Sequence, residues 1–176
     1  ELTEAIDFFT RINKIPLNWV EEPIQADRPE NEWQKLSSIT NIPLAAGENI
    51  RGLDIFNRKI KDGNLGVIQP DICKWGGISA NIMVVKGILE NGINYCPHFL
   101  GGGIGLIASA HLLAGSGGDG MLEVDFNQNP LREGLADPFP KIIKSKITLN
   151  NTPGLGVVPD QASIEQYLVY HTQIKK

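Results

Sequence analysis

The sequence of 176 residues has little cysteine and no long hydrophobic or basic run. No apolar stretch approaches the roughly 18 residues that a membrane-spanning helix needs, so we expect no membrane partner. The net charge is −4 and no Lys/Arg-rich run is present, which argues against a nucleic-acid-binding protein. The first ten residues carry acids where a signal peptide would carry bases. Because the two cysteines, Cys73 and Cys96, lack metal-ligand spacing, we interpret them as buried, reduced thiols of a cytoplasmic protein.

Short apolar segments alternate with amphipathic segments along the first 137 residues. Leu2, Ala5, Ile6 and Phe9, for example, recur at a spacing typical of one helix face. Strands that alternate with helices of about 10 to 14 residues indicate βα units and a parallel sheet. The pattern predicts helices at 1–14, 31–40, 52–63, 79–92 and 103–118, and strands at 17–23, 42–49, 65–71, 93–98 and 120–125.

Each expected strand ends at or near an ionisable residue. Five such residues follow one another at intervals of 27, 23, 27 and 25 residues: Glu21 (or Glu22), Glu48, Asp71, His98 and Glu123. Any one of them could be charged only because strand ends meet solvent, but five in register favour a shared site. In a (β/α)8 barrel the carboxyl ends of all strands converge on one face, where active sites lie. We therefore expect an α/β fold with a parallel TIM-type barrel, because the strand ends of an open sheet would spread along a line.

The chemistry of such a ring of side chains can be read from the residue types. Glu21 and Glu48 on neighbouring strands offer hard oxygen ligands suited to Mg²⁺. Asp71 can fix the tautomer of His98 and raise the basicity of its other ring nitrogen. Glu123 can donate a proton to an oxyanion of the substrate. A metal, a base and a donor together suit proton abstraction next to the carboxylate of a small-molecule substrate.

The motifs "WVEEP", "AAGEN", "IQPDICKWGGIS", "CPHFLGGGIGLIASAHL" and "LEVD" together resemble the enolase superfamily, in its mandelate racemase/muconate lactonizing enzyme family. The similarity runs from about residue 17 to residue 160. The resemblance implies that Glu21 and Glu48 are the second and third metal ligands, that Asp71 pairs with the base His98, and that Glu123 hydrogen-bonds the substrate carboxylate.

The resemblance also implies that parts of the family's catalytic unit lie outside this sequence. The first metal ligand, an additional base and the capping domain have no counterpart here. We therefore expect a C-terminal portion of the barrel, with about five strands in residues 1–137. An extended segment, residues 138–176, would pack back on the barrel or the capping domain.

The implied activity is that of a Mg²⁺-dependent enzyme. Acid-sugar dehydration is the first expectation, and racemisation or epimerisation of a 2-hydroxy or related acid is the alternative. A third alternative is a non-catalytic fragment or a degenerate family member. By itself this chain should bind Mg²⁺ weakly and be inactive, and its unpaired sheet edges should favour a homo-oligomer.

Three further residues invite a function and have a simpler interpretation. Lys74 could contact an anionic substrate, but a solvated loop lysine is the expectation. Trp75 is expected to pack at the edge of the barrel, and His111 to be a packed, hydrogen-bonded residue of a helix. The run "GGGIG" lacks the Lys-Ser/Thr pair of a phosphate-binding P-loop.

Overall fold

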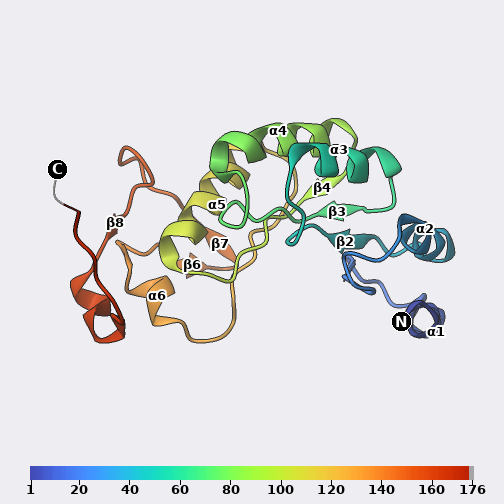
Figure 1. Ribbon diagram of the computed structural model, residues 1–176, viewed down its shortest axis with the longest axis horizontal. Coiled ribbons are helices and arrows are strands. Elements are labelled where there is room, and N and C mark those ends of the chain that lie inside the picture. Colours follow the sequence, from blue (N-terminus) through green and yellow to red (C-terminus); the bar gives the residue numbers. More distant parts are fainter. Residues whose placement is uncertain (175–176) are drawn as a thin grey trace.

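The computed structural model describes residues 1–174 and has an α/β architecture (Figure 1). Five longer helices and four short parallel strands alternate in the first two thirds of the chain. The helices are α1 (Leu2–Ile12), α2 (Glu30–Ile39), α3 (Leu53–Asp62), α4 (Gly77–Glu90) and α5 (Gly103–Ser116). The strands are β1 (Val20–Glu21), β2 (Leu44–Ala46), β3 (Val67–Ile68) and β4 (Asn94–Tyr95).

The four strands form one parallel sheet in the order β1-β2-β3-β4. Glu21 lies beside Ala45, Ala45 beside Val67, and Val67 beside Asn94. Sequential order, with a helix between each pair of strands, is the arrangement of consecutive βα units in a barrel. The expected portion of a parallel TIM-type barrel is confirmed for these four strands.

Successive side chains of a strand point to opposite faces of the sheet. The two faces therefore carry different side chains and contact different parts of the molecule. Helix residues such as Phe9, Trp33 and Ile88 pack with Leu44 and Ile68 in the main hydrophobic core. The other face carries a small cluster built from Ala45, Val67, Cys96 and the partly buried Trp19. The second cluster faces what would be the barrel interior.

The expected strand at 120–125 is wrong, because this segment has no strand hydrogen bonding. It still passes close to the end of β4, where the backbone N–H of Met121 donates to the Cys96 Sγ at 3.4 Å. Gly120 lies so close to the carbonyl oxygen of Tyr95 that a side chain would collide with it. A contact to a side-chain sulfur replaces the ladder bond, so the segment runs beside the sheet without joining it.

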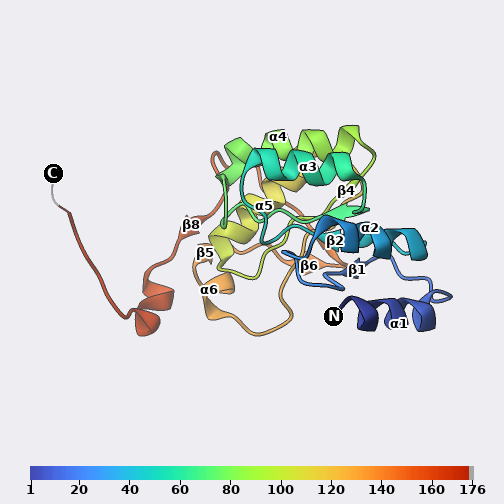
Figure 2. The same cartoon turned by 45° about the vertical axis from the view of Figure 1, so that its right-hand side comes forward.

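The remaining elements are short. Helix α6 (Pro130–Glu133) is followed in the sequence by four short strands, which form two antiparallel pairs, and then by the 3₁₀ helix η1 (Ala162–Tyr167). The pairs are β5 (Ala136–Asp137) with β8 (Val158–Pro159), and β6 (Ile142–Ile143) with β7 (Lys146–Ile147). Figures 1 and 2 show η1 far from α1, at the opposite end of the molecule.

The expectations for the two cysteines and for His111 can be compared with their exposure and hydrogen bonds. Cys96 is buried as expected, but Cys73 is exposed, because it lies in the turn that follows Asp71. His111 is packed and hydrogen-bonded as expected, with Nε2 3.0 Å from the carbonyl oxygen of Leu155. Among residues 1–174, no helix has the length and apolar character needed to cross a bilayer.

Replacing Ile88 by Ala should lower the free energy of unfolding by about 2–5 kcal/mol, because Ile88 is fully buried where α4 meets the core. Ile82 in the same helix is 54% exposed and provides the matched control. Urea denaturation of both variants measures the difference. Equal losses in Ile88→Ala and Ile82→Ala would contradict the packing described here.

Candidate active site

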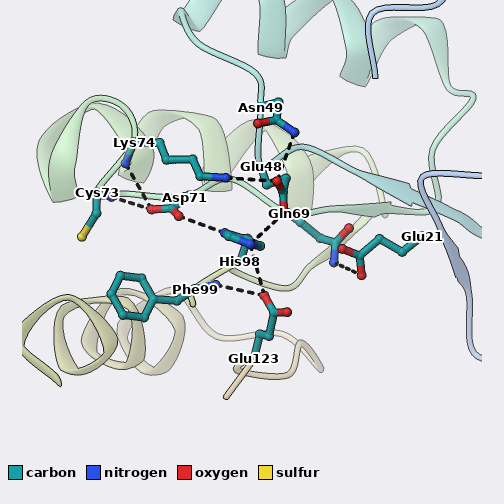
Figure 3. Close-up of polar contacts among 10 residues, drawn as sticks. All are labelled: Glu21, Glu48, Asn49, Gln69, Asp71, Cys73, Lys74, His98, Phe99 and Glu123. Atoms are coloured by element: carbon teal, nitrogen blue, oxygen red, sulfur yellow. Dashed lines mark hydrogen bonds and ion pairs between the residues drawn. The ribbon is translucent and has the colours of Figure 1, made fainter. Parts of the chain in front are cut away.

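The centre of the site is a hydrogen bond between two buried side chains that follow neighbouring strands. Asp71 follows β3 and His98 follows β4, and Asp71 Oδ2 lies 2.9 Å from His98 Nδ1. The other carboxylate oxygen, Oδ1, accepts hydrogen bonds from the backbone N–H groups of Cys73 (2.7 Å) and Lys74 (3.1 Å). The loop after β3 therefore fixes the aspartate, and the aspartate fixes the imidazole ring (Figure 3).

The second ring nitrogen of His98 faces carboxylates. Nε2 lies 2.7 Å from Glu48 Oε2 and 3.9 Å from Glu123 Oε2. Glu48 follows β2, and its Oε1 also accepts from Lys74 Nζ and Asn49 Nδ2, both at 3.0 Å. Lys74 is an exposed loop lysine, as expected, and it also forms an ion pair with Glu48 that the sequence did not predict. Its position in the turn after Asp71 points it back across the strand ends.

Glu123 is held in the site by the main chain. Its Oε2 accepts a hydrogen bond of 3.0 Å from the backbone N–H of Phe99, the residue after His98. This contact brings a residue of the irregular segment 120–125 to the end of β4. Four of the five expected site residues, Glu48, Asp71, His98 and Glu123, therefore meet around one imidazole ring.

Glu21 stands at the edge of this group. It lies at the end of β1 and is exposed, and its Oε2 accepts a 2.9 Å hydrogen bond from Gln69 Nε2. Gln69 is a buried residue that directly follows β3. Figure 3 shows this pair beside, and separate from, the contacts around His98.

The carboxylates give the strand ends a negative field. Burial raises the pKa of Glu22, and the charges of Glu48 and Glu21 raise it further. Burial also raises the pKa of Glu123, and Glu21 and Glu48 add to that effect, while the Phe99 N–H and His98 oppose it. One oxygen of Glu22, Oε1, is buried without a hydrogen-bond partner. A cation at this place would offset the repulsion between the carboxylates.

The donor set suits a hard cation in part. Glu21 and Glu48 are carboxylates at the ends of adjacent strands, and each is hydrogen-bonded by a neighbouring side chain. Carboxylate oxygens are ligands of the kind that Mg²⁺ prefers. Within residues 1–174, however, no group of three or more His, Cys, Asp and Glu side chains is arranged to hold a metal ion. These two glutamates could supply two ligands of a magnesium site.

A cavity of about 610 Å³ adjoins the dyad, and it is of a size that holds small-molecule ligands. Glu48, Asp71, Lys74 and His98 are among its lining residues. The other lining residues are Cys73, Leu135 and residues of the segment from Phe99 to Gly105. A small acid could therefore reach the imidazole ring from this side.

The sequence analysis gave no role to Gln69 and did not predict the ion pair between Lys74 and Glu48. Gln69 precedes Asp71 by two residues, and a spacing of two places both side chains on the same face of an extended chain. That periodicity was the available signal for Gln69. The reach of Lys74 back to Glu48 depends on the turn after Asp71, which no pattern in the sequence indicates.

Replacing Glu22 by Gln should stabilise the protein increasingly as the pH rises above 4.5, the ordinary pKa of a glutamate. The folded state holds the Glu22 proton more tightly than the unfolded chain does. The wild type therefore loses stability as the pH rises from 4.5 to the raised pKa, and the variant does not. Urea denaturation at a series of pH values from about 4 to 7 measures the difference. Glu165→Gln, at an exposed site, is the control, and a difference independent of pH would contradict the assignment.

Comparisons with known proteins agree on one family. The family model described as "Enolase C-terminal domain-like" matches residues 1–163. A solved mandelate racemase/muconate lactonizing enzyme from Bordetella bronchiseptica RB50 is 44% identical, with a TM-score of 0.90 over 96% of this chain and 47% of that chain. The 3,6-anhydro-D-galactonate cycloisomerase from Zobellia galactanivorans is 27% identical, with a TM-score of 0.88 over 97% of this chain and 48% of that chain.

A curated relative gives the same result from sequence. The arabinonate dehydratase of Saccharolobus solfataricus is 26% identical over 164 residues, which are 93% of this chain and 43% of the relative. The chain thus spans less than half the length of the relatives that it matches. It belongs to the enolase superfamily, in the mandelate racemase/muconate lactonizing enzyme family.

Proposed function

We propose that the protein carrying this chain is a Mg²⁺-dependent enzyme that abstracts the proton alpha to the carboxylate of a small acid, and that it is an acid-sugar dehydratase. The observation that carries the proposal is the Asp71–His98 hydrogen bond of 2.9 Å, which turns the second ring nitrogen of His98 toward Glu48 and Glu123. Relatives from other organisms support the substrate class by their names, which include arabinonate dehydratase and D-galactonate dehydratase.

His98 is the proposed base. Asp71 accepts a hydrogen bond from the N–H group of Nδ1 and thereby favours the tautomer in which Nε2 can take up the substrate proton. Both side chains are buried, so the ring is oriented before a substrate arrives. Nε2 contacts Glu48 in the structure, and it acts as a base when that contact is released.

Glu123 is the proposed donor to the substrate. Burial raises its pKa, which favours the protonated carboxyl that can donate a hydrogen bond to a developing oxyanion. Its position 3.9 Å from His98 Nε2 puts the donor beside the base. A substrate carboxylate in this place would meet both groups at once.

Glu21 and Glu48 are the proposed ligands of Mg²⁺. When bound, the metal supplies positive charge that stabilises the negative charge formed on the substrate as the alpha proton leaves. Burial raises the pKa values of Glu22 and Glu123, and the charges of Glu21 and Glu48 raise them further. The negative charge that these two glutamates bring to the strand ends supports a cation at this place in the working enzyme.

Racemisation or epimerisation of a 2-hydroxy or related acid is the second candidate function. The same dyad can abstract the proton in both reactions; in dehydration a β-hydroxyl then leaves, whereas in epimerisation a second group must deliver a proton to the opposite face of the intermediate. The name of the solved structure that is 44% identical includes mandelate racemase, whereas a curated relative is named arabinonate dehydratase. A panel of acid sugars, assayed with Mg²⁺ for 2-keto-3-deoxy acids and for epimers, distinguishes the two.

Replacing Asp71 by Asn should lower the turnover number of the whole protein by about two to four orders of magnitude, the usual contribution of general acid–base catalysis. Asparagine retains an oxygen for the N–H groups of Cys73 and Lys74, so the loop should keep its shape. Its NH₂ group would face His98 and favour the wrong tautomer. Steady-state assays with Mg²⁺ on the acid-sugar panel measure the effect.

The control for this variant is Asp54→Asn, which removes an exposed carboxylate that pairs with Arg58 at 3.7 Å on helix α3. Its turnover should equal that of the wild type. If Asp71→Asn retains wild-type turnover with a native circular dichroism spectrum, His98 is not a base oriented by Asp71.

A further inference from the structure

The Gln69 side chain connects the ends of two strands that are not neighbours, β1 and β3. Glu21 ends β1 and Gln69 follows β3, so the hydrogen bond between them crosses the end of β2. At the crossing point β2 is followed by Gly47, which has a φ of 149°. A Cβ atom at Gly47 would lie 2.6 Å from the backbone nitrogen of Gln69. The glycine allows the close approach of the two backbones, and it leaves space for the amide to reach Glu21.

The environment of Gln69 shows that its side chain is held in place. Only 4% of the residue is exposed, and its backbone N–H donates to the carbonyl oxygen of Ala46 at 3.0 Å. The backbone bond does not depend on the side chain. The side-chain amide therefore donates to Glu21 and takes no part in the backbone hydrogen bonds of the sheet.

The two glutamates are held by donors of different charge. Lys74 donates to Glu48 as a cation, whereas Gln69 donates to Glu21 as a neutral group. A neutral donor orients a carboxylate without cancelling its charge. The Gln69 bond occupies Oε2 of Glu21, and among the hydrogen bonds of residues 1–174 none other reaches this carboxylate. The second oxygen, Oε1, stays available to a cation.

We infer that Gln69 is a positioning residue for the metal ligand Glu21. It restricts the rotation of an exposed, flexible carboxylate and directs one oxygen toward the strand ends where Glu48 lies. Partners of this kind around metal ligands typically change metal affinity by about 10- to 100-fold when they are removed. The inference rests on the proposed function, since it takes Glu21 as a ligand of Mg²⁺.

The test is the affinity of the whole protein for Mg²⁺ alone, measured by calorimetry without substrate. Gln69→Met keeps the length of the side chain and removes the donor, and it should weaken Mg²⁺ binding about tenfold. Gln69→Asn keeps the amide but shortens its reach, and it should also weaken binding. The second variant decides the question if Gln69→Met fails to fold. Thermal denaturation checks that each variant is folded.

Two further variants separate the possible failures. Asn64→Leu removes an amide–carboxylate bond of the same kind, from Asn64 Nδ2 to Glu30 Oε1 at 2.5 Å, away from the strand ends, and it should leave Mg²⁺ affinity unchanged. Glu21→Gln should weaken Mg²⁺ binding more than either Gln69 variant. If Glu21→Gln has no effect, the ligand assignment of the proposed function is wrong. If Glu21→Gln weakens binding and folded Gln69 variants bind like the wild type, the positioning role of Gln69 is wrong.

Discussion

The parallel pairing of four short strands is the constraint on which the rest of the structure depends. Each pair is aligned so that consecutive strands end at the same level, and the residues that follow them meet without any long connection. Glu48, Asp71 and His98 are 23 and 27 residues apart in sequence, yet they form one hydrogen-bonded chain. A shift of register by one residue would turn each side chain to the opposite face.

The end of β2 and the position after it are occupied by small residues. Ala45 and Ala46 are buried in the strand, and Gly47 follows them where the backbone of Gln69 comes closest. Larger residues here would separate β1 from the side chains of β3. The close approach of Gln69 therefore depends on the glycine that follows β2.

Much of this arrangement could be predicted from the sequence, because it follows from periodic features. Helices and strands alternate with a clear apolar pattern, and four of the five expected strands formed. The interval between Asp71 and His98 correctly indicated neighbouring strand ends. The strand at 120–125 could not be judged from its residues, because strand formation depends on a partner backbone and its apolar pattern is equally compatible with an extended loop. The ion pair of Lys74 and the exposure of Cys73 depend on a turn whose path the sequence pattern does not define.

The alternation of the strands has a consequence for how the protein can vary. Leu44 and Ile68 point to the helices, whereas Ala45 and Val67 point to the opposite face, toward the level at which the charged residues stand. Alternate positions of each strand therefore have different roles: one set packs against the helices and stabilises the domain, and the other set lies on the face toward the charged residues. Substitutions at the positions that face the charged residues can change the site while the positions that face the helices keep the fold. One sheet can thus carry different sites on the same hydrophobic core.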